Sequence, residues 1–207
     1  MISQAEIHEK AFSKDGNQRW IALKLLESEF YYFEDKNAAW QDLVNLAHDE
    51  YFKIRWDAVL ALRSVFFQVP DKDRSWKDLV MVSSDFGTRE DAAETLGWAF
   101  SLVTDKKQAW SDLHEMLDKK NDISMRKVAA VATETAFHHI PNKEQAWEDL
   151  CILAQDENSR PEEYENFKDS YRLSPFEVRV SRWNATSALQ SIFAQVPDKE
   201  QARKDLL

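Results

Sequence analysis

Apolar residues recur along the chain in a block that repeats five times without a gap. Each block begins with an Arg and carries an Ala three residues later, a Leu or Thr at seven residues and a Phe at eleven. The five blocks run over residues 19–30, 55–66, 89–100, 126–137 and 182–193. Because these offsets share one side of a helix with 3.6 residues per turn, each block predicts a helix with one buried stripe, here called helix B.

A second block, Ala-Trp-x-Asp-Leu, places its Trp ten residues after the Phe of the preceding block. Its copies are residues 39–43, 109–113 and 146–150, with the variants Ser75-Trp76-Lys77-Asp78-Leu79 and Ala202-Arg203-Lys204-Asp205-Leu206. On a helix, the Ala, Trp and Leu share the buried side and the Asp lies about 100° away at its edge. The block predicts a short helix A, whose Trp fills the space between stacked units and whose Asp bonds a base of a neighbouring unit.

The two kinds of helix are joined by a repeated turn sequence. It reads Val69-Pro70-Asp71-Lys72, Ile140-Pro141-Asn142-Lys143 and Val196-Pro197-Asp198-Lys199. Proline ends helix B, and the Asp or Asn that follows is placed to cap the N-terminus of helix A. We therefore interpret the Asp-Lys pair as structural.

The long period defines the domain organisation. Trp40, Trp76, Trp110 and Trp147 lie 36, 34 and 37 residues apart, and a period in this range is typical of stacked supersecondary units. The predicted units are residues 1–34, 35–70, 71–104, 105–141 and 142–197, with a partial sixth over 198–207. The fold prediction is a single all-α repeat domain of about five helical hairpins, and only three glycines interrupt it.

The fifth unit carries an insertion of about 20 residues over 156–177, between its helices A and B. Insertions in repeat proteins form loops on one edge, often a working edge. Tyr164, Phe167 and Tyr171 are its candidate contact residues. The alternative is a tolerated surface loop.

These units resemble HEAT and HEAT-like repeats. The resemblance rests on Leu46-Ala47-His48-Asp49 followed by Ile54-Arg55, Ala58 and Ala61-Leu62, and on Met125-Arg126 with Ala129-Ala130. It covers most of the chain and implies a right-handed α–α superhelix, with A helices outside and B helices on the concave side. It also implies protein binding, and hydrogen bonds between units through the Asp that ends helix A and the Arg that opens helix B. Asp49 and Arg55 occupy those places.

The candidate binding residues lie opposite the buried stripe of helix B, on the implied concave side. They are Tyr32, Asp57, Leu60, Asp91, Glu94, Trp98 and His139. Aromatic anchors beside charges suit recognition of a protein or peptide. The alternative is that Tyr32 and Trp98 pack between neighbouring units, and the same packing is expected of Trp20, Trp56 and Trp183.

The composition narrows the classes of partner that the chain is expected to bind. A formal net charge of -10 argues against nucleic acid and against an anionic membrane surface, and it favours a basic partner. The single cysteine, Cys151, cannot form an internal disulfide, fits a reducing cytoplasm and is expected in the core. We see no signal peptide in residues 1–12 and no transmembrane run.

No catalytic, cofactor or metal motif emerges, so the leading prediction is a non-catalytic interaction scaffold that binds on the concave face. The competing class is an enzyme of the same repeat group. Deoxyhypusine hydroxylase needs four His-Glu dipeptides and this chain has two, at His8 and His114. A DNA alkylpurine glycosylase needs a basic groove, and nothing points to a bilin lyase. A third class is a structural module of a larger complex, and Leu206-Leu207 predicts self-association at an uncapped end.

Overall fold

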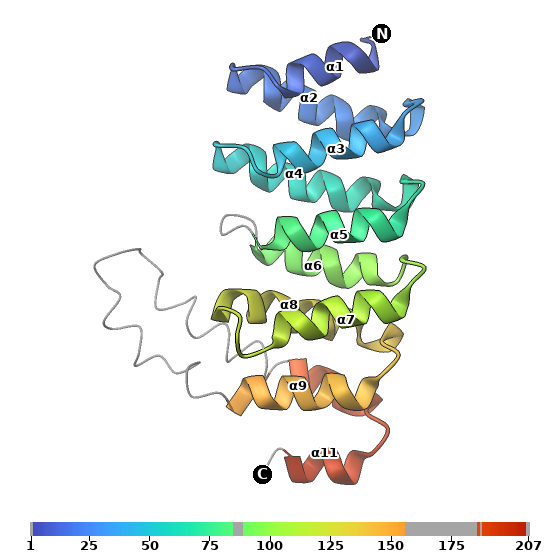
Figure 1. Ribbon diagram of the computed structural model, residues 1–207, viewed down its shortest axis with the longest axis vertical. Helices are drawn as coiled ribbons and strands as arrows, with labels where there is room; N and C mark the ends of the chain where they lie inside the picture. The colour runs from blue at the N-terminus through green and yellow to red at the C-terminus, as the bar shows by residue number, and fades with distance from the viewer. Residues whose placement is uncertain (1, 85–88, 156–185, 187, 206–207) are drawn as a thin grey trace, which may run out of the picture. The chain divides into compact units, whose positions relative to one another are not determined.

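The computed structural model describes residues 2–84, 89–155, 186 and 188–205, with the side chains of residues 89–91 and 124 excepted (Figure 1). Every regular element in these residues is a helix, which confirms the predicted all-α class. The chain divides into two compact units, Met1–Asp105 and Lys106–Leu207.

The first unit consists of three helical hairpins in series. The hairpins are α1 (Gln4–Ala11) with α2 (Gly16–Glu29), α3 (Lys36–Leu46) with α4 (Phe52–Val65), and α5 (Lys72–Ser83) with α6 (Arg89–Phe100). Helix α3 contacts both α1 and α5, and α4 contacts both α2 and α6. The A helices therefore form one layer of this unit and the B helices form the other, as Figure 1 shows.

The second unit repeats the same hairpin. Its described elements are α7 (Lys106–Leu117), α8 (Ile123–Ala136), η3 (Phe137–His139), α9 (Lys143–Gln155), η6 (Phe193–Gln195) and α11 (Lys199–Asp205). Helix α7 contacts α8 within the hairpin and α9 of the next repeat.

The B-helix stripe is buried as the spacing predicts. Ala22, Leu26 and Phe30 are fully buried in the first repeat, and so are the corresponding residues of the second. The α-helix, however, stops one residue before the Phe in the first, second and fourth repeats. There the Phe opens a 3-10 turn: η1 (Phe30–Tyr32), η2 (Phe66–Gln68) or η3. The backbone N–H of Phe33 closes this turn on the carbonyl of Phe30.

The Trp of helix A fills the space inside its own repeat. The rings of Trp40 and Phe66 lie 5.7 Å apart in a T-shaped arrangement, and those of Trp76 and Phe100 lie 5.8 Å apart. Trp40 is 2% exposed. The sequence predicts this Trp between stacked units; the Phe that it contacts belongs to helix B of the same hairpin, and the Trp40 indole bonds Asp78 of the next repeat, so this Trp contacts both repeats. Edge-on aromatic pairs of this kind add to the stabilisation that burial alone provides.

The Asp-Lys pair caps two helix ends at once. The carboxylate of Asp71 accepts a hydrogen bond from the Arg74 backbone N–H at 3.0 Å, which confirms its N-cap role. The Lys72 ammonium donates to the Val69 carbonyl at 3.0 Å. Equivalent lysine contacts run from Lys36 to the carbonyls of Tyr31 and Phe33, and from Lys143 to those of His138 and Ile140. The lysine thus satisfies carbonyls at the end of the preceding 3-10 turn, a role that the sequence did not reveal.

Within the described ranges, no helix is both long enough and apolar enough to cross a membrane.

Candidate interaction surface

The Asp of the Ala-Trp-x-Asp-Leu block joins consecutive repeats. The indole N–H of Trp40 donates to Asp78 Oδ2 at 2.8 Å, and that of Trp147 donates to Asp205 Oδ2 at 3.0 Å. Where the preceding A helix carries a histidine, the partner is imidazole Nδ1. His8 lies 2.8 Å from Asp42 Oδ1, and His114 lies 2.5 Å from Asp149 Oδ2. The predicted inter-repeat role is confirmed, with a ring nitrogen as the usual partner.

Asp42 is the most deeply buried of these carboxylates, at 3% exposed. Burial raises the pKa of its carboxyl above the usual range, and the hydrogen bond and charge of His8 pull that pKa down in part. A buried carboxylate with a dedicated donor is a structural joint rather than an open site.

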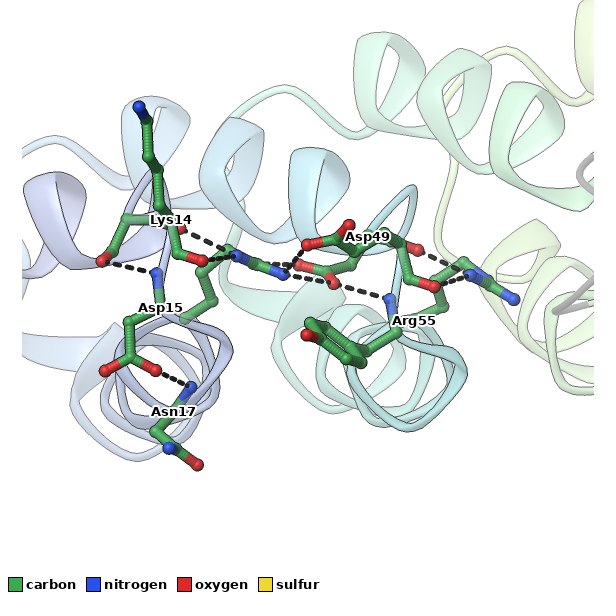
Figure 2. A network of polar contacts seen from close by, with 9 residues as sticks. Lys14, Asp15, Asn17, Asp49 and Arg55 are labelled. Atoms are coloured by element: carbon green, nitrogen blue, oxygen red, sulfur yellow. Dashed lines mark hydrogen bonds and ion pairs between the residues drawn. The ribbon is translucent and has the colours of Figure 1, made fainter.

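A second joint is built around Arg19 and links the first repeat to the second (Figure 2). Its guanidinium binds both carboxylate oxygens of Asp49, at 2.5 and 3.0 Å, and Glu50 Oε1 at 2.9 Å. It also donates to the carbonyls of Ser13 and Lys14. These bonds raise the pKa of Arg19, with Asp49 as the largest cause. Such a network has no donor left to offer a ligand.

Arg55 repeats the backbone contacts of Arg19, to the carbonyls five and six residues earlier in the chain. Its Nη1 donates to the backbone carbonyls of Asp49 and Glu50, at 2.6 and 3.0 Å. The ladder that the resemblance implied therefore has one described side-chain rung, Arg19 with Asp49. Both arginines act as structural residues, as predicted.

The predicted binding residues of the first unit divide by exposure. Tyr32 is 72% exposed and its ring lies edge-on to that of Tyr31 in the same turn, so exposure argues against the packing alternative for Tyr32. Trp98 is half-buried, with its ring 6.2 Å from that of Phe66 in the preceding repeat, so the packing alternative holds for Trp98. Leu60 is also half-buried.

The predicted acidic centre is largely neutralised. Asp57 Oδ2 lies 3.6 Å from the Lys24 ammonium and accepts from the indole N–H of Trp20 at 3.3 Å. Glu94 pairs with Arg63 at 3.1 Å. Both pairs connect neighbouring B helices, so these two carboxylates hold the layer together as well as lining its surface.

Several predicted residues stand apart from this surface. His139 belongs to the second unit, where it is exposed in η3; desolvation, followed by nearby positive charges, lowers its pKa. The side chain of Asp91 and the residues Trp183, Leu206 and Leu207 lie outside the described part. So does the insertion, with Tyr164, Phe167 and Tyr171.

Large exposed apolar side chains are concentrated in the first two repeats. The sequence patterns did not predict this concentration. Of the twelve in the described residues, ten lie between positions 2 and 67: Ile2, Phe12, Trp20, Ile21, Tyr31, Tyr32, Tyr51, Phe52, Trp56 and Phe67. Trp20 and Trp56 occupy the same place in consecutive repeats and are each 40% exposed. Glu90 and Lys127 hold that place in the next two repeats. A position that accepts a charge is open to solvent, so this comparison could have revealed the surface.

We define the aromatic surface as Trp20, Ile21, Tyr32 and Trp56. It runs from Trp20 on α2 to Tyr32 in η1 and reaches α4 at Trp56, because the Trp20 indole bonds Asp57 beside it. Twelve residues of helix correspond to about 18 Å at 1.5 Å per residue. The surface is therefore long enough for several residues of an extended peptide.

The described residues offer little for catalysis. No three His, Cys, Asp or Glu side chains among them converge to hold a metal ion. Cys151 is buried in α9, and burial raises the pKa of its thiol to about 11. A buried thiol of high pKa is a poor nucleophile, which confirms its placement in the core.

Comparison of the chain with protein-family models, with curated proteins and with solved structures gives no match. The feature of the described residues that most resembles an interaction site is the aromatic surface of the first two repeats.

Proposed function

We propose that this chain is a non-catalytic interaction scaffold that binds a protein or peptide through the aromatic surface. The observation that carries the proposal is the concentration of exposed apolar side chains between positions 2 and 67. Single exposed apolar residues are ordinary, whereas a group of them on one part of a protein is typical of an interaction site. Trp and Tyr are also the side chains that contribute most to binding energy at interfaces.

The net charge of the chain favours a basic partner. The chain carries a net charge of -10, whereas Asp57 beside the aromatic surface is already paired with Lys24. A partner that carries Lys or Arg next to apolar residues complements an apolar surface on an acidic chain, and the field of an acidic protein speeds its association.

The proposal includes the HEAT-like repeat architecture as a right-handed superhelix. Its support is the repeat period and, within the first unit, the contacts of A helices with A helices and of B helices with B helices. In such an array the B layer is the concave side, and a concave surface can surround an extended peptide. The single cysteine supports a place in the reducing cytoplasm.

The test is a selection from a random peptide display library on the full chain. We expect selected peptides to combine aromatic or aliphatic residues with Lys or Arg. The variant Trp20→Ser/Trp56→Ser should bind them roughly thirtyfold more weakly, the loss that about 2 kcal/mol at an interface centre produces. Its folding is checked by circular dichroism.

The matched control is Met81→Ser, because Met81 is 52% exposed but lies on the A-layer helix α5. It should bind the peptides like the wild type. Selected peptides that bind the double Trp variant as well as the wild type would contradict the proposal, as would a selection with no enrichment.

A further inference from the structure

A hollow of about 630 Å³ lies beside the aromatic surface, between the start of α1 and the end of α2. Its apolar lining includes Ile2, Ile7, Leu25 and Phe33. Tyr32, which belongs to the aromatic surface, also lines it. The hollow is therefore the end of that surface rather than a separate place.

Two carboxylates, Glu29 and Glu34, also line the hollow, together with Ser3 and Gln4. Within the described part of the chain neither carboxylate has a hydrogen bond or an ion pair, in contrast to Asp57 and Glu94. None of the described residues that line the hollow is a Lys, Arg or His. An apolar hollow with two unpaired carboxylates has the charge that complements a cation on an aliphatic stem.

The η1 turn, which carries Tyr32, already binds one ammonium group of the chain itself. Lys36 Nζ lies 5.7 Å from the centre of the Tyr31 ring and donates to the carbonyls of Tyr31 and Phe33. The neighbouring ring of Tyr32 is 72% exposed, and no described cation lies over it. Tyrosine faces attract ammonium and guanidinium groups, most strongly when these are partly desolvated.

The lining residues Leu25 and Glu29 distinguish the first repeat from the second. Leu25 and Glu29 correspond to Ala61 and Val65 of the second repeat, which are 0% and 1% exposed because α2 covers that side of α4. In α2 the same two positions line the hollow instead. The chain thus places a longer aliphatic residue and a carboxylate where its next repeat has small buried residues.

We propose that the hollow binds one Lys or Arg side chain of the peptide that occupies the aromatic surface, an inference that rests on the proposed function. The aliphatic stem lies against Ile7, Leu25 and Phe33, and the charged head meets Glu29, Glu34 and the ring of Tyr32. Long basic side chains commonly bury their stems in this way while the charge stays near water.

The distance between the hollow and Trp20 also predicts how far apart the basic residue and the apolar anchor of a bound peptide should be. Trp20 and Tyr32 are twelve residues apart along α2 and η1, which corresponds to about 18 Å at 1.5 Å per helical residue. An extended peptide covers that length with about five residues. Bound peptides should therefore carry a Lys or Arg about five positions from an aromatic or aliphatic anchor.

The first test uses n-hexylammonium as the probe on the full chain, with hexanoate and hexanol as matched ligands of similar length. Methyl NMR follows Ile2, Ile7 and Leu25. We expect hexylammonium to shift these methyl signals at millimolar concentration and hexanoate to leave them unchanged. Glu29→Gln/Glu34→Gln should weaken hexylammonium binding by about threefold to fivefold per carboxylate, as loss of an exposed ion pair allows.

The control variant, Glu9→Gln/Glu144→Gln, removes the same charge from exposed positions that do not line the hollow. It should keep the hexylammonium affinity. Equal shifts from hexanol, hexanoate and hexylammonium would overturn the proposal, and so would unchanged binding by Glu29→Gln/Glu34→Gln.

The second test separates this inference from the proposed function. In a selected peptide, replacing the spaced Lys by norleucine should weaken binding to the wild type but not to Glu29→Gln/Glu34→Gln. If the replacement has no effect while Trp20→Ser/Trp56→Ser still abolishes binding, the hollow is not the basic subsite and the aromatic surface stands. If hexylammonium binds but no peptide is selected, the cation site stands and the proposed function fails.

Discussion

At the scale of single residues, burial decides which charged contacts matter. Arg19 binds two carboxylates of the second repeat at comparable distances (Figure 2). The side chain of Asp49 is 4% exposed, whereas that of Glu50 is 72% exposed. Removing the charge of a buried partner leaves Arg19 poorly compensated, whereas water replaces an exposed one.

We therefore predict that Asp49→Asn lowers the free energy of unfolding by about 3 kcal/mol, a value typical of a broken buried pair. Glu50→Gln should cost less than about 1 kcal/mol. Urea unfolding followed by circular dichroism measures both. Equal losses in the two variants would show that the Arg19 joint does not depend on burial.

Cys151 gives a second prediction at this scale. Burial raises the pKa of its thiol to about 11, and the carboxylates of Asp205 and Glu148 add to the effect. At pH 8 the thiolate fraction is then about one in a thousand, so a maleimide should react at least about a hundredfold more slowly than with a free cysteine. Labelling should become fast once urea unfolds the chain. Fast labelling of the folded protein would contradict the core assignment.

At the scale of elements, the turn from helix B to helix A is a compact capping device. One carboxylate caps the helix that begins, and the adjacent ammonium satisfies carbonyls of the turn that ends. Because both residues belong to one dipeptide, the turn holds its geometry without glycine.

The prediction for this turn compares three single substitutions at the start of the third repeat. Asp71→Ala should cost about 1 kcal/mol as a lost N-cap. Lys72→Gln should cost about 0.5 to 1.5 kcal/mol, the range of one hydrogen bond. Lys77→Gln, an exposed lysine on α5, is the control and should cost almost nothing. If Lys72→Gln matches the control in thermal unfolding, the ammonium contact does not contribute to stability.

The sequence could predict the helices but not every detail of their ends. A residue such as Phe66 must be buried whether the last turn is α-helical or 3-10, so periodicity does not distinguish the two. Lys72 follows an N-cap and therefore resembles an ordinary surface lysine. The hydrophobic character of Trp20 and Trp56 predicts packing between repeats, and Trp20 does bond Asp57 of the next repeat. Glu90 and Lys127 at the same repeat position are the sequence signal that this position is also partly open to solvent.

At the scale of the whole molecule, the repeats share one framework and differ in what they expose. Each described Trp–Phe pair and each Asp joint serves stability. Ten of the twelve large exposed apolar side chains in the described residues, by contrast, lie in the first two repeats. We therefore expect the residues that bind a partner to be among those that vary between repeats, with recognition confined to α2, the η1 turn and α4.

The net charge of the whole molecule predicts how salt changes the association rate of a basic peptide. The chain carries a net charge of -10, and a basic peptide is attracted to it over a Debye length of about 10 Å at 0.1 M salt. Raising the salt concentration should slow association of a Lys-containing peptide more than it speeds dissociation. Stopped-flow kinetics at two salt concentrations measures both rates, and a salt-independent association rate would argue against a basic partner.

The most direct test of the central claim is amide hydrogen exchange on the full chain, with and without a selected peptide. We predict that the peptide slows exchange in α2, α4 and the η1 turn, because the aromatic surface lies on these elements. Residues 106–155 should exchange at the same rate in both states. Slower exchange confined to residues 106–155, with none in α2 or α4, would contradict the account.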